Sequence, residues 1–193
     1  GDVARFGFFS KFTLAAWIYP AAPTGAIVTR AQDLAEGDGY GLYLKDGKVQ
    51  LNLVQRWLDD ALRVETEGPL ELGRWHHVAA SYDGSRAADG VKIYVNGKES
   101  KLHILLDDLN QDFATREPLR IGGGGGPENR FRGSIDDVHV YSAVLAAEQA
   151  AALAAPDPMN EIAALAPEKR SRAQADKLAW YYLDQHAPPH IRE

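Results

Sequence analysis

The sequence has no cysteine, no long apolar run and no run of basic residues. Without cysteine there is neither a disulfide nor redox chemistry at sulfur, so stability must come from the burial of apolar side chains. No segment approaches the roughly 20 apolar residues that a membrane-spanning helix needs. The formal net charge of −6 repels phosphate, and no cluster of Lys and Arg offsets it. We therefore expect no nucleic acid as partner and no insertion into a membrane.

What is present is typical of a soluble globular protein. The 193 residues are 45% hydrophobic and 25% charged, which is close to the average for such proteins. This length allows one well-filled core, or one domain with a short appendage. The start at Gly1 has neither a basic nor an apolar signal region, so any export signal is expected upstream.

Short alternating segments separated by turn residues run from Phe12 to Tyr141, a pattern typical of an antiparallel β-sandwich. The dipeptides Asp46-Gly47 and Asn96-Gly97 suit the positive φ angles of tight turns. They predict one hairpin of residues 40–45 with 48–54, and another of residues 91–95 with 98–102. Further strands are expected at 12–19, 26–30, 61–66, 75–82, 119–122 and 131–141. The side chains expected in the core are Phe12, Leu14, Ala16, Ile18, Leu42, Leu44, Val49, Leu51 and Leu53.

The last predicted strand contains a conflict. Ile135 and Val138 cannot face the same way under strict alternation. A bulge near Asp136-Asp137 would resolve it, because one extra residue restores the facing.

After Tyr141 the sequence becomes rich in alanine, and residues 142–153 are predicted to form a helix. Residues 159–166 suit a short helix, and Ser171 with Gln174 suits a capping box for another helix ending near His186. We therefore divide the chain into a sandwich over residues 1–157 and a helical C-terminal extension, or linker to a following domain, over 158–193. About 35 residues without disulfide or metal are too few for a core of their own, so the extension is expected to pack on a neighbour.

Four strings of residues carry a resemblance to a known family. They are Phe12-Thr-Leu-Ala-Ala-Trp17-Ile-Tyr-Pro20, Trp75-His-His-Val-Ala-Ala-Ser-Tyr82-Asp83-Gly84, Val91-Lys-Ile-Tyr-Val-Asn96-Gly97 and Phe131-Arg-Gly133-Ser-Ile-Asp136-Asp137-Val-His-Val-Tyr141. In this order they resemble a laminin-G-like domain of the concanavalin-A-like lectin and glucanase superfamily, over about residues 6–153. The resemblance implies an all-β fold, a two-sheet antiparallel jelly-roll sandwich, here with a short C-terminal helical extension.

Two other segments, 26–30 and 166–174, resemble the version of this module found in large exported bacterial proteins that also carry c-type haem domains. That resemblance implies an extracellular or periplasmic location. This sequence has no Cys-x-x-Cys-His, so no haem attaches to this piece.

Catalysis by paired carboxylates finds little support. Glu65 and Glu67 could share a strand face at the separation of a retaining pair. They lack the third carboxylate of the family's Glu-x-Asp-x-x-Glu pattern, and Gly68-Pro69 ends the strand. We assign no catalytic residue and expect no enzyme activity.

A ligand site is better supported on the sheet face opposite the core. Tyr43, Gln50 and Asn52 alternate with the buried leucines there, and Arg56 and Trp57 follow in the next loop. An aromatic ring with nearby amides and charges can stack on a sugar and bond its hydroxyls. The alternative is that Trp57 only folds over the edge of the sandwich. Trp17 and Trp75 are expected in the core.

The resemblance also implies a structural Ca²⁺, with Asp136 at the position of the family's aspartate. Calcium takes six to eight oxygen ligands, so one aspartate does not make a site. The alternative is that Asp136 caps the predicted bulge through backbone amides. No other cofactor is expected.

The function that these observations favour is a non-catalytic recognition module, binding carbohydrate or a protein surface within a larger exported protein. A structural spacer between domains, without a soluble ligand, is the second possibility, and a glycoside hydrolase the third. The expected partner is a glycan or a neighbouring protein domain.

Overall fold

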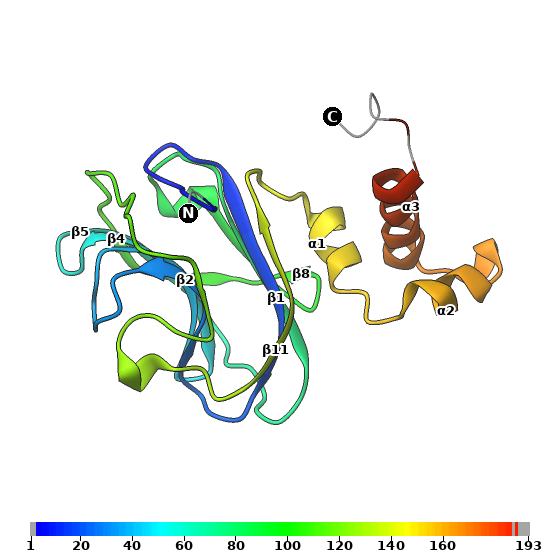
Figure 1. The fold of residues 1–193 in the computed structure, drawn as a ribbon, viewed down its shortest axis with the longest axis horizontal. Helices are drawn as coiled ribbons and strands as arrows, with labels where there is room; N and C mark the ends of the chain where they lie inside the picture. Colours follow the sequence, from blue (N-terminus) through cyan, green and yellow to red (C-terminus); the bar gives the residue numbers. More distant parts are fainter. Residues whose placement is uncertain (1–2, 187, 189–193) are drawn as a thin grey trace.

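In the computed structural model, which describes residues 3–186 and 188, the chain forms two antiparallel sheets followed by three short helices (Figure 1). The five-stranded sheet has the order β11 (Gly133–Tyr141), β1 (Phe12–Pro20), β6 (His76–Tyr82), β7 (Val91–Val95), β8 (Lys98–Glu99). The six-stranded sheet has the order β10 (Arg120–Ile121), β2 (Gly25–Ala31), β3 (Gly39–Lys45), β4 (Lys48–Arg56), β5 (Asp60–Thr66), β9 (Leu102–Asp107). The predicted fold class is confirmed.

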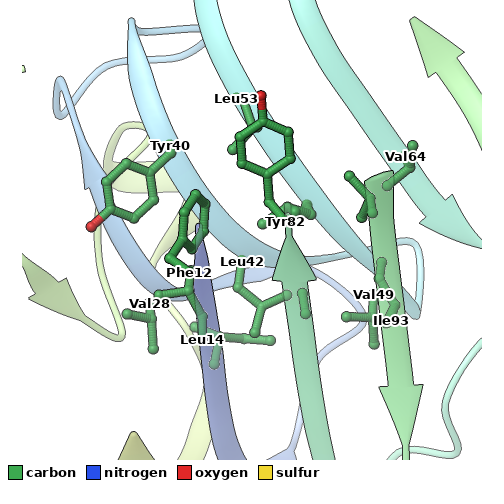
Figure 2. Close-up of a cluster of buried hydrophobic side chains, with 14 of the residues drawn as sticks. Phe12, Leu14, Val28, Tyr40, Leu42, Val49, Leu53, Val64, Tyr82 and Ile93 are labelled. Carbon is green, nitrogen blue, oxygen red and sulfur yellow. The ribbon is translucent and has the colours of Figure 1, made fainter. Parts of the chain in front are cut away.

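The core lies between the two sheets (Figure 2). Phe12 and Leu14 of β1, with Tyr82 and Ile93 of the same sheet, belong to one buried cluster with Leu42 of the other sheet. The nine side chains that the alternation of the strands placed in the core, from Phe12 to Leu53, are all buried. Full burial of such a side chain contributes about 1.5–3 kcal/mol, so alternation on both sheets accounts for the assembly of the sandwich.

Both predicted hairpins form. Asp46 and Gly47 have φ angles of 51° and 80°, and Asn96 and Gly97 have φ angles of 50° and 75°, as the tight turns require. The strand predicted at 98–102 stops at Glu99, and the chain crosses to the other sheet, where β9 pairs with β5. The apolar residues that follow Lys101 thus cover the edge of β5 rather than extend the second hairpin.

The predicted bulge in β11 is confirmed. Ala15 pairs with His139 and Trp17 with Asp136, so two residues of β11 oppose one of β1. Asp137 has a φ of 48°, and its N–H donates to Oδ1 of Asp136 at 2.8 Å.

Helix α1 (Ala147–Leu153) begins later than residue 142. The preceding segment is instead tied to β1, where Oγ1 of Thr13 donates to the Ala143 carbonyl at 2.7 Å and accepts from the Leu145 N–H at 3.2 Å. Helix α1 packs on the outer face of the five-stranded sheet, where Ala150 joins a buried cluster with Ala15 and Tyr94.

Helices α2 (Met159–Ala164) and α3 (Arg172–His186) continue the helical part. The predicted capping box is present, because the Ser171 N–H donates to Gln174 Oε1 at 2.8 Å and the Gln174 N–H donates to Ser171 Oγ at 3.2 Å. Helix α3 packs against α1 and α2, and Nζ of Lys177 donates to the Ala155 carbonyl at 2.5 Å. The helices therefore lie beyond the five-stranded sheet, away from β4 and β5 (Figure 1).

Three short 3₁₀ helices complete the described structure, at Ala88–Gly90, Pro127–Asn129 and Pro167–Lys169. In the part of the chain that the structure describes, no helix is long and apolar enough to span a bilayer.

Candidate functional site

The outer face of the six-stranded sheet carries a hollow of about 450 Å³. Two rows of side chains cross the sheet at this place. In one row Gly41 pairs with Asn52 and Asn52 with Arg63, and in the other Tyr43 pairs with Gln50. Because alternate residues of a strand share a face, these side chains point away from the core. Three of the predicted ligand residues, Tyr43, Gln50 and Asn52, therefore lie together in the hollow, and Trp57 lines it as well.

The ring of Tyr43 forms part of one wall. A Cβ atom added to Gly41 would lie 2.6 Å from Cε2 of Tyr43, and one added to Gly125 would lie 3.4 Å from Cε1. Glycine at 41 is what leaves room for the ring. Burial raises the pKa of the Tyr43 phenol, so the hydroxyl stays protonated at neutral pH and is available as a hydrogen-bond donor.

Asn52 and Arg63 lie opposite each other on β4 and β5, on the floor of the hollow. Asn52 is only 5% exposed. Within residues 3–186, neither Oδ1 of Asn52 nor Nε of Arg63 has a hydrogen-bond partner, although both atoms are buried. Buried polar atoms are usually paired, because leaving one unpaired costs about 1–3 kcal/mol. The floor of the hollow thus holds one acceptor and one donor that the described residues leave without a partner.

Trp57 and Arg63 are in contact. The guanidinium carbon of Arg63 lies 4.0 Å from the centroid of the Trp57 ring, which is the geometry of a cation–π interaction. The half-buried Trp57 folds over the β4–β5 turn and also lines the hollow. Its contact with Arg63 shows that the ring positions a cation, beyond any role as a stacking surface for sugar.

Arg63 was not among the residues predicted from the sequence. It lies on a predicted strand and alternates with Glu65, so the register of the β4–β5 pair could have placed it beside Asn52. Arg56, which was predicted, does not line the hollow. Its exposed side chain pairs with Asp59, with Nε 2.9 Å from Oδ1.

Glu65 belongs to a structural network beside the hollow. Its Oε1 accepts from Nζ of Lys48 at 2.7 Å, and its Oε2 accepts from Nε2 of Gln50 at 2.8 Å. Burial raises the pKa of Glu65, but the hydrogen bonds from Lys48, Gln50 and His103 together bring it below its ordinary value. Glu67 is exposed and follows the end of β5. Glu65 is therefore held as a carboxylate that orients the Gln50 amide.

The loop at 122–130 forms a second wall, and it is firmly attached. Oγ1 of Thr29 donates to the Gly123 carbonyl at 2.7 Å. The guanidinium of Arg130 makes two bonds to Asp33, at 2.9 and 2.5 Å, and Asp33 also accepts from the Gly126 N–H at 3.2 Å. This glycine-rich segment thus forms a wall that contacts within the protein hold in place.

Asp136 lies on the other sheet, remote from the hollow. Its Oδ1 accepts the Asp137 N–H at the bulge, as the capping alternative predicted. Among the described residues no group of three or more His, Asp or Glu could hold a metal ion. Ligation of Ca²⁺ by Asp136 stays a prediction.

Two further tryptophans, Trp17 and Trp75, differ from expectation. Trp75 is 44% exposed and meets Tyr19 edge-on at 5.7 Å, so its prediction as a core residue is wrong. It precedes β6, which begins at His76, so the alternation of that strand does not decide which way its side chain faces. Trp17 is half-buried on the outer face of the five-stranded sheet, with its ring 5.5 Å from that of His77.

Comparison with protein families gives one match, to the laminin-G family model described as "Concanavalin A-like lectin/glucanases superfamily", over residues 2–151. Several solved structures share the fold. A carbohydrate-binding module (CBM40) of the Ruminococcus gnavus IT-sialidase, bound to α2,3 sialyllactose, is 18% identical with a TM-score of 0.59, and the match covers 74% of this chain and 82% of that one.

The SAP-like pentraxin of Limulus polyphemus is 22% identical, with a TM-score of 0.53 and coverage of 77% and 71%. A candidate carbohydrate-binding protein from Bacteroides ovatus is 23% identical, with a TM-score of 0.53. The match covers 75% of this chain but only 40% of the Bacteroides protein. At these identities the likeness shows a shared fold.

Proposed function

The chain belongs to the concanavalin A-like lectin/glucanases superfamily, and from this premise we propose that it is a non-catalytic recognition module that binds carbohydrate in the hollow of its six-stranded sheet. The observation that carries the proposal is the pair of buried, unpartnered polar atoms on the floor, Oδ1 of Asn52 and Nε of Arg63. A sugar hydroxyl both donates and accepts, so it can satisfy an acceptor and a donor that stand close together.

The size and shape of the hollow support the same function. About 450 Å³ lies within the range of small-molecule sites, about 300–1,000 Å³. Its walls are held by contacts within the protein, including the bonds of Arg130 to Asp33. A preformed site avoids part of the entropy cost of ordering loops when a ligand binds.

A binding role agrees better than hydrolysis with the state of Glu65. A glycosidase needs a carboxylic acid of raised pKa to protonate the leaving group. The pKa of Glu65 is lowered instead, and both of its oxygens accept hydrogen bonds within the protein. The carbohydrate-binding module of the Ruminococcus gnavus IT-sialidase, one of the structural neighbours, supports a role in recognition.

We propose further that the module serves in a larger exported protein of the kind that carries c-type haem domains, and acts outside the cytoplasm. The segments 26–30 and 166–174 support this context. The Bacteroides protein also shows the fold as part of a much longer chain.

One observation favours an alternative role in contact with a neighbouring domain. Tyr181, Tyr182 and Leu183 on α3 are all exposed, Tyr182 by 62%. Apolar side chains gathered on one helix mark interaction surfaces more often than single exposed ones do. In that case the module would position its neighbours, and the hollow would have no ligand.

A glycan array separates the two roles. We expect the purified chain to bind at least one saccharide class, and Asn52→Leu to abolish that binding without unfolding the protein. Glu99→Gln, on β8 of the other sheet, is the matched control and should bind as the parent does. Binding that survives in Asn52→Leu would show that the hollow is not the site, and an array without any bound saccharide would favour the interdomain role.

A further inference from the structure

We infer that the hollow selects saccharides that carry an acidic group, and that Arg63 binds this group. The inference rests on the proposed carbohydrate function and deepens it by naming the ligand class. It comes from the state of the Arg63 guanidinium, which neither the sequence motifs nor the family membership addresses.

The position of Arg63 is fixed before a ligand binds. Its guanidinium lies over the Trp57 ring, 4.0 Å from the centroid, and its stem rises from the middle of β5. The described part of the chain provides no carboxylate within ion-pairing distance of it. Arg63 differs in this respect from Arg120, which pairs with Glu117, and from Arg130, which pairs with Asp33.

Partial burial makes this unpaired charge unfavourable. A cation removed from water loses hydration that only a nearby negative charge or strong acceptors can replace. Burial lowers the pKa of Arg63, and its Nε is buried without an acceptor. An anionic oxygen in the hollow would supply both the charge and the missing acceptor, as planar arginine–carboxylate pairs do.

The acidic residues of the hollow do not cancel this preference. Glu36, Asp46 and Glu128 line it from loops and from the β3–β4 turn, where their side chains are exposed to solvent. Glu36 acts on Arg63 only through its longer-range field. Charges on an exposed rim are screened by water and salt, whereas the floor, with Arg63, has a lower effective dielectric. The ligand charge is therefore felt most strongly at Arg63.

Asn52 shows why the ligand is a sugar and not a free anion. Its unpartnered Oδ1 is an acceptor and needs a donor, which a carboxylate or sulfate ion does not have. A neutral sugar would satisfy Asn52 but leave Arg63 without a counter-charge. A sugar with a hydroxyl beside a carboxylate or sulfate group satisfies both residues, which are direct neighbours across β4 and β5.

The test compares acidic saccharides with their neutral counterparts by isothermal titration calorimetry. The pairs are sialyllactose with lactose, trigalacturonate with its carboxyl-reduced form, and galactose 6-sulfate with galactose, so that carboxylate and sulfate are distinguished. Inorganic sulfate is titrated alone. We expect the acidic member of at least one pair to bind about tenfold or more tightly than its neutral partner, and to weaken when NaCl is raised from about 50 to about 500 mM.

Three variants assign the preference to Arg63. Arg63→Gln should remove the advantage of the acidic sugar, and Arg63→Lys, which keeps the charge, should retain part of it. Arg74→Gln removes an exposed arginine outside the hollow and should change nothing. Circular dichroism checks that each variant is folded. If Arg63→Gln fails to fold, Arg63→Lys and the salt dependence of the parent still test whether Arg63 binds the acidic group.

Each opposing result has a distinct meaning. Equal binding of acidic and neutral sugars in the hollow would overturn the inference and leave the proposed function standing. Inorganic sulfate that binds as tightly as the sugars would show a simple anion site. If no saccharide of any pair binds, the proposed function fails and the inference fails with it.

Discussion

Asn52 and Arg63 face each other across β4 and β5, and each presents a buried polar atom for which the described residues provide no hydrogen-bond partner. One atom accepts and the other donates. Such an arrangement lowers the stability of the free protein and is compensated when a ligand supplies the missing partners.

We therefore predict that Asn52→Leu removes saccharide binding without lowering the stability of the folded protein. The leucine has a similar volume and removes the unpaired acceptor, so the melting temperature should stay the same or rise, while saccharide binding disappears. Differential scanning calorimetry with and without ligand measures both effects. A fall in melting temperature of more than about 3 °C, roughly 1 kcal/mol for a domain of this size, would show that Asn52 has a structural partner.

The buried His77, on the side of the five-stranded sheet that faces the helices, should make the free energy of unfolding sensitive to acid. The residue is 1% exposed, and neither ring nitrogen has a partner within the described chain. Burial lowers its pKa from 6.5 to about 4, assisted by the charges of His139 and Lys177 and opposed by Asp137. Between these two pH values the unfolded chain takes up a proton that the folded chain does not, so the free energy of unfolding falls as the pH falls. Above about pH 6.5 the effect is absent, and below about pH 4 no further loss occurs.

Urea denaturation at pH 7 and at pH 5 measures this loss of free energy of unfolding, in the parent and in His77→Phe. From the shift, the parent should lose about 2 kcal/mol over this interval, and the phenylalanine variant, which keeps a ring against Trp17, should lose much less. At pH 5 carboxylates such as Glu65, whose pKa is lowered, remain ionised and do not contribute. An equal loss in both proteins would place the acid sensitivity elsewhere.

Calcium binding at Asp136 is tested by stability. A metal that binds only the folded state raises the melting temperature by mass action. We predict that millimolar Ca²⁺ raises the melting temperature of the parent and that Asp136→Ala removes the increment. A melting temperature that does not respond to Ca²⁺ would retire this proposal and leave Asp136 as the cap of the bulge.

Removal of the residues after Pro158 tests the proposed domain boundary. The sandwich carries its own core, and α1 remains attached to the five-stranded sheet through Ala150. We predict a folded truncated protein with changed self-association, measured by analytical ultracentrifugation, because the exposed Tyr182 is lost and the outer side of α1 is uncovered. Ile162 of α2 is fully buried, so a truncated chain that fails to fold would mean that the extension belongs to the core.

Local chemistry made much of the sandwich predictable. Turn dipeptides such as Asp46-Gly47 act over four residues, and alternation along β3 and β4 separates core from surface, so Tyr43, Gln50 and Asn52 could be placed on one face. The end of the second hairpin could not be predicted, because the pattern continues past Glu99 while the partner strand changes. The walls of the hollow depend on contacts between distant parts of the chain, such as Asp33 with Arg130. The loop after β4 likewise takes its shape from Trp57 meeting Arg63, and so Trp57 lines the hollow and Arg56 does not.

The most direct test of the account is a ¹H–¹⁵N NMR titration of the chain with the tightest-binding saccharide from the array. The largest shifts should occur in the side-chain amides of Asn52 and Gln50, the Arg63 Nε–H and the Trp57 indole, and the signals of the five-stranded sheet and of α3 should not move. Shifts concentrated on α3 or around Asp136, with the signals of the hollow unchanged, would contradict it.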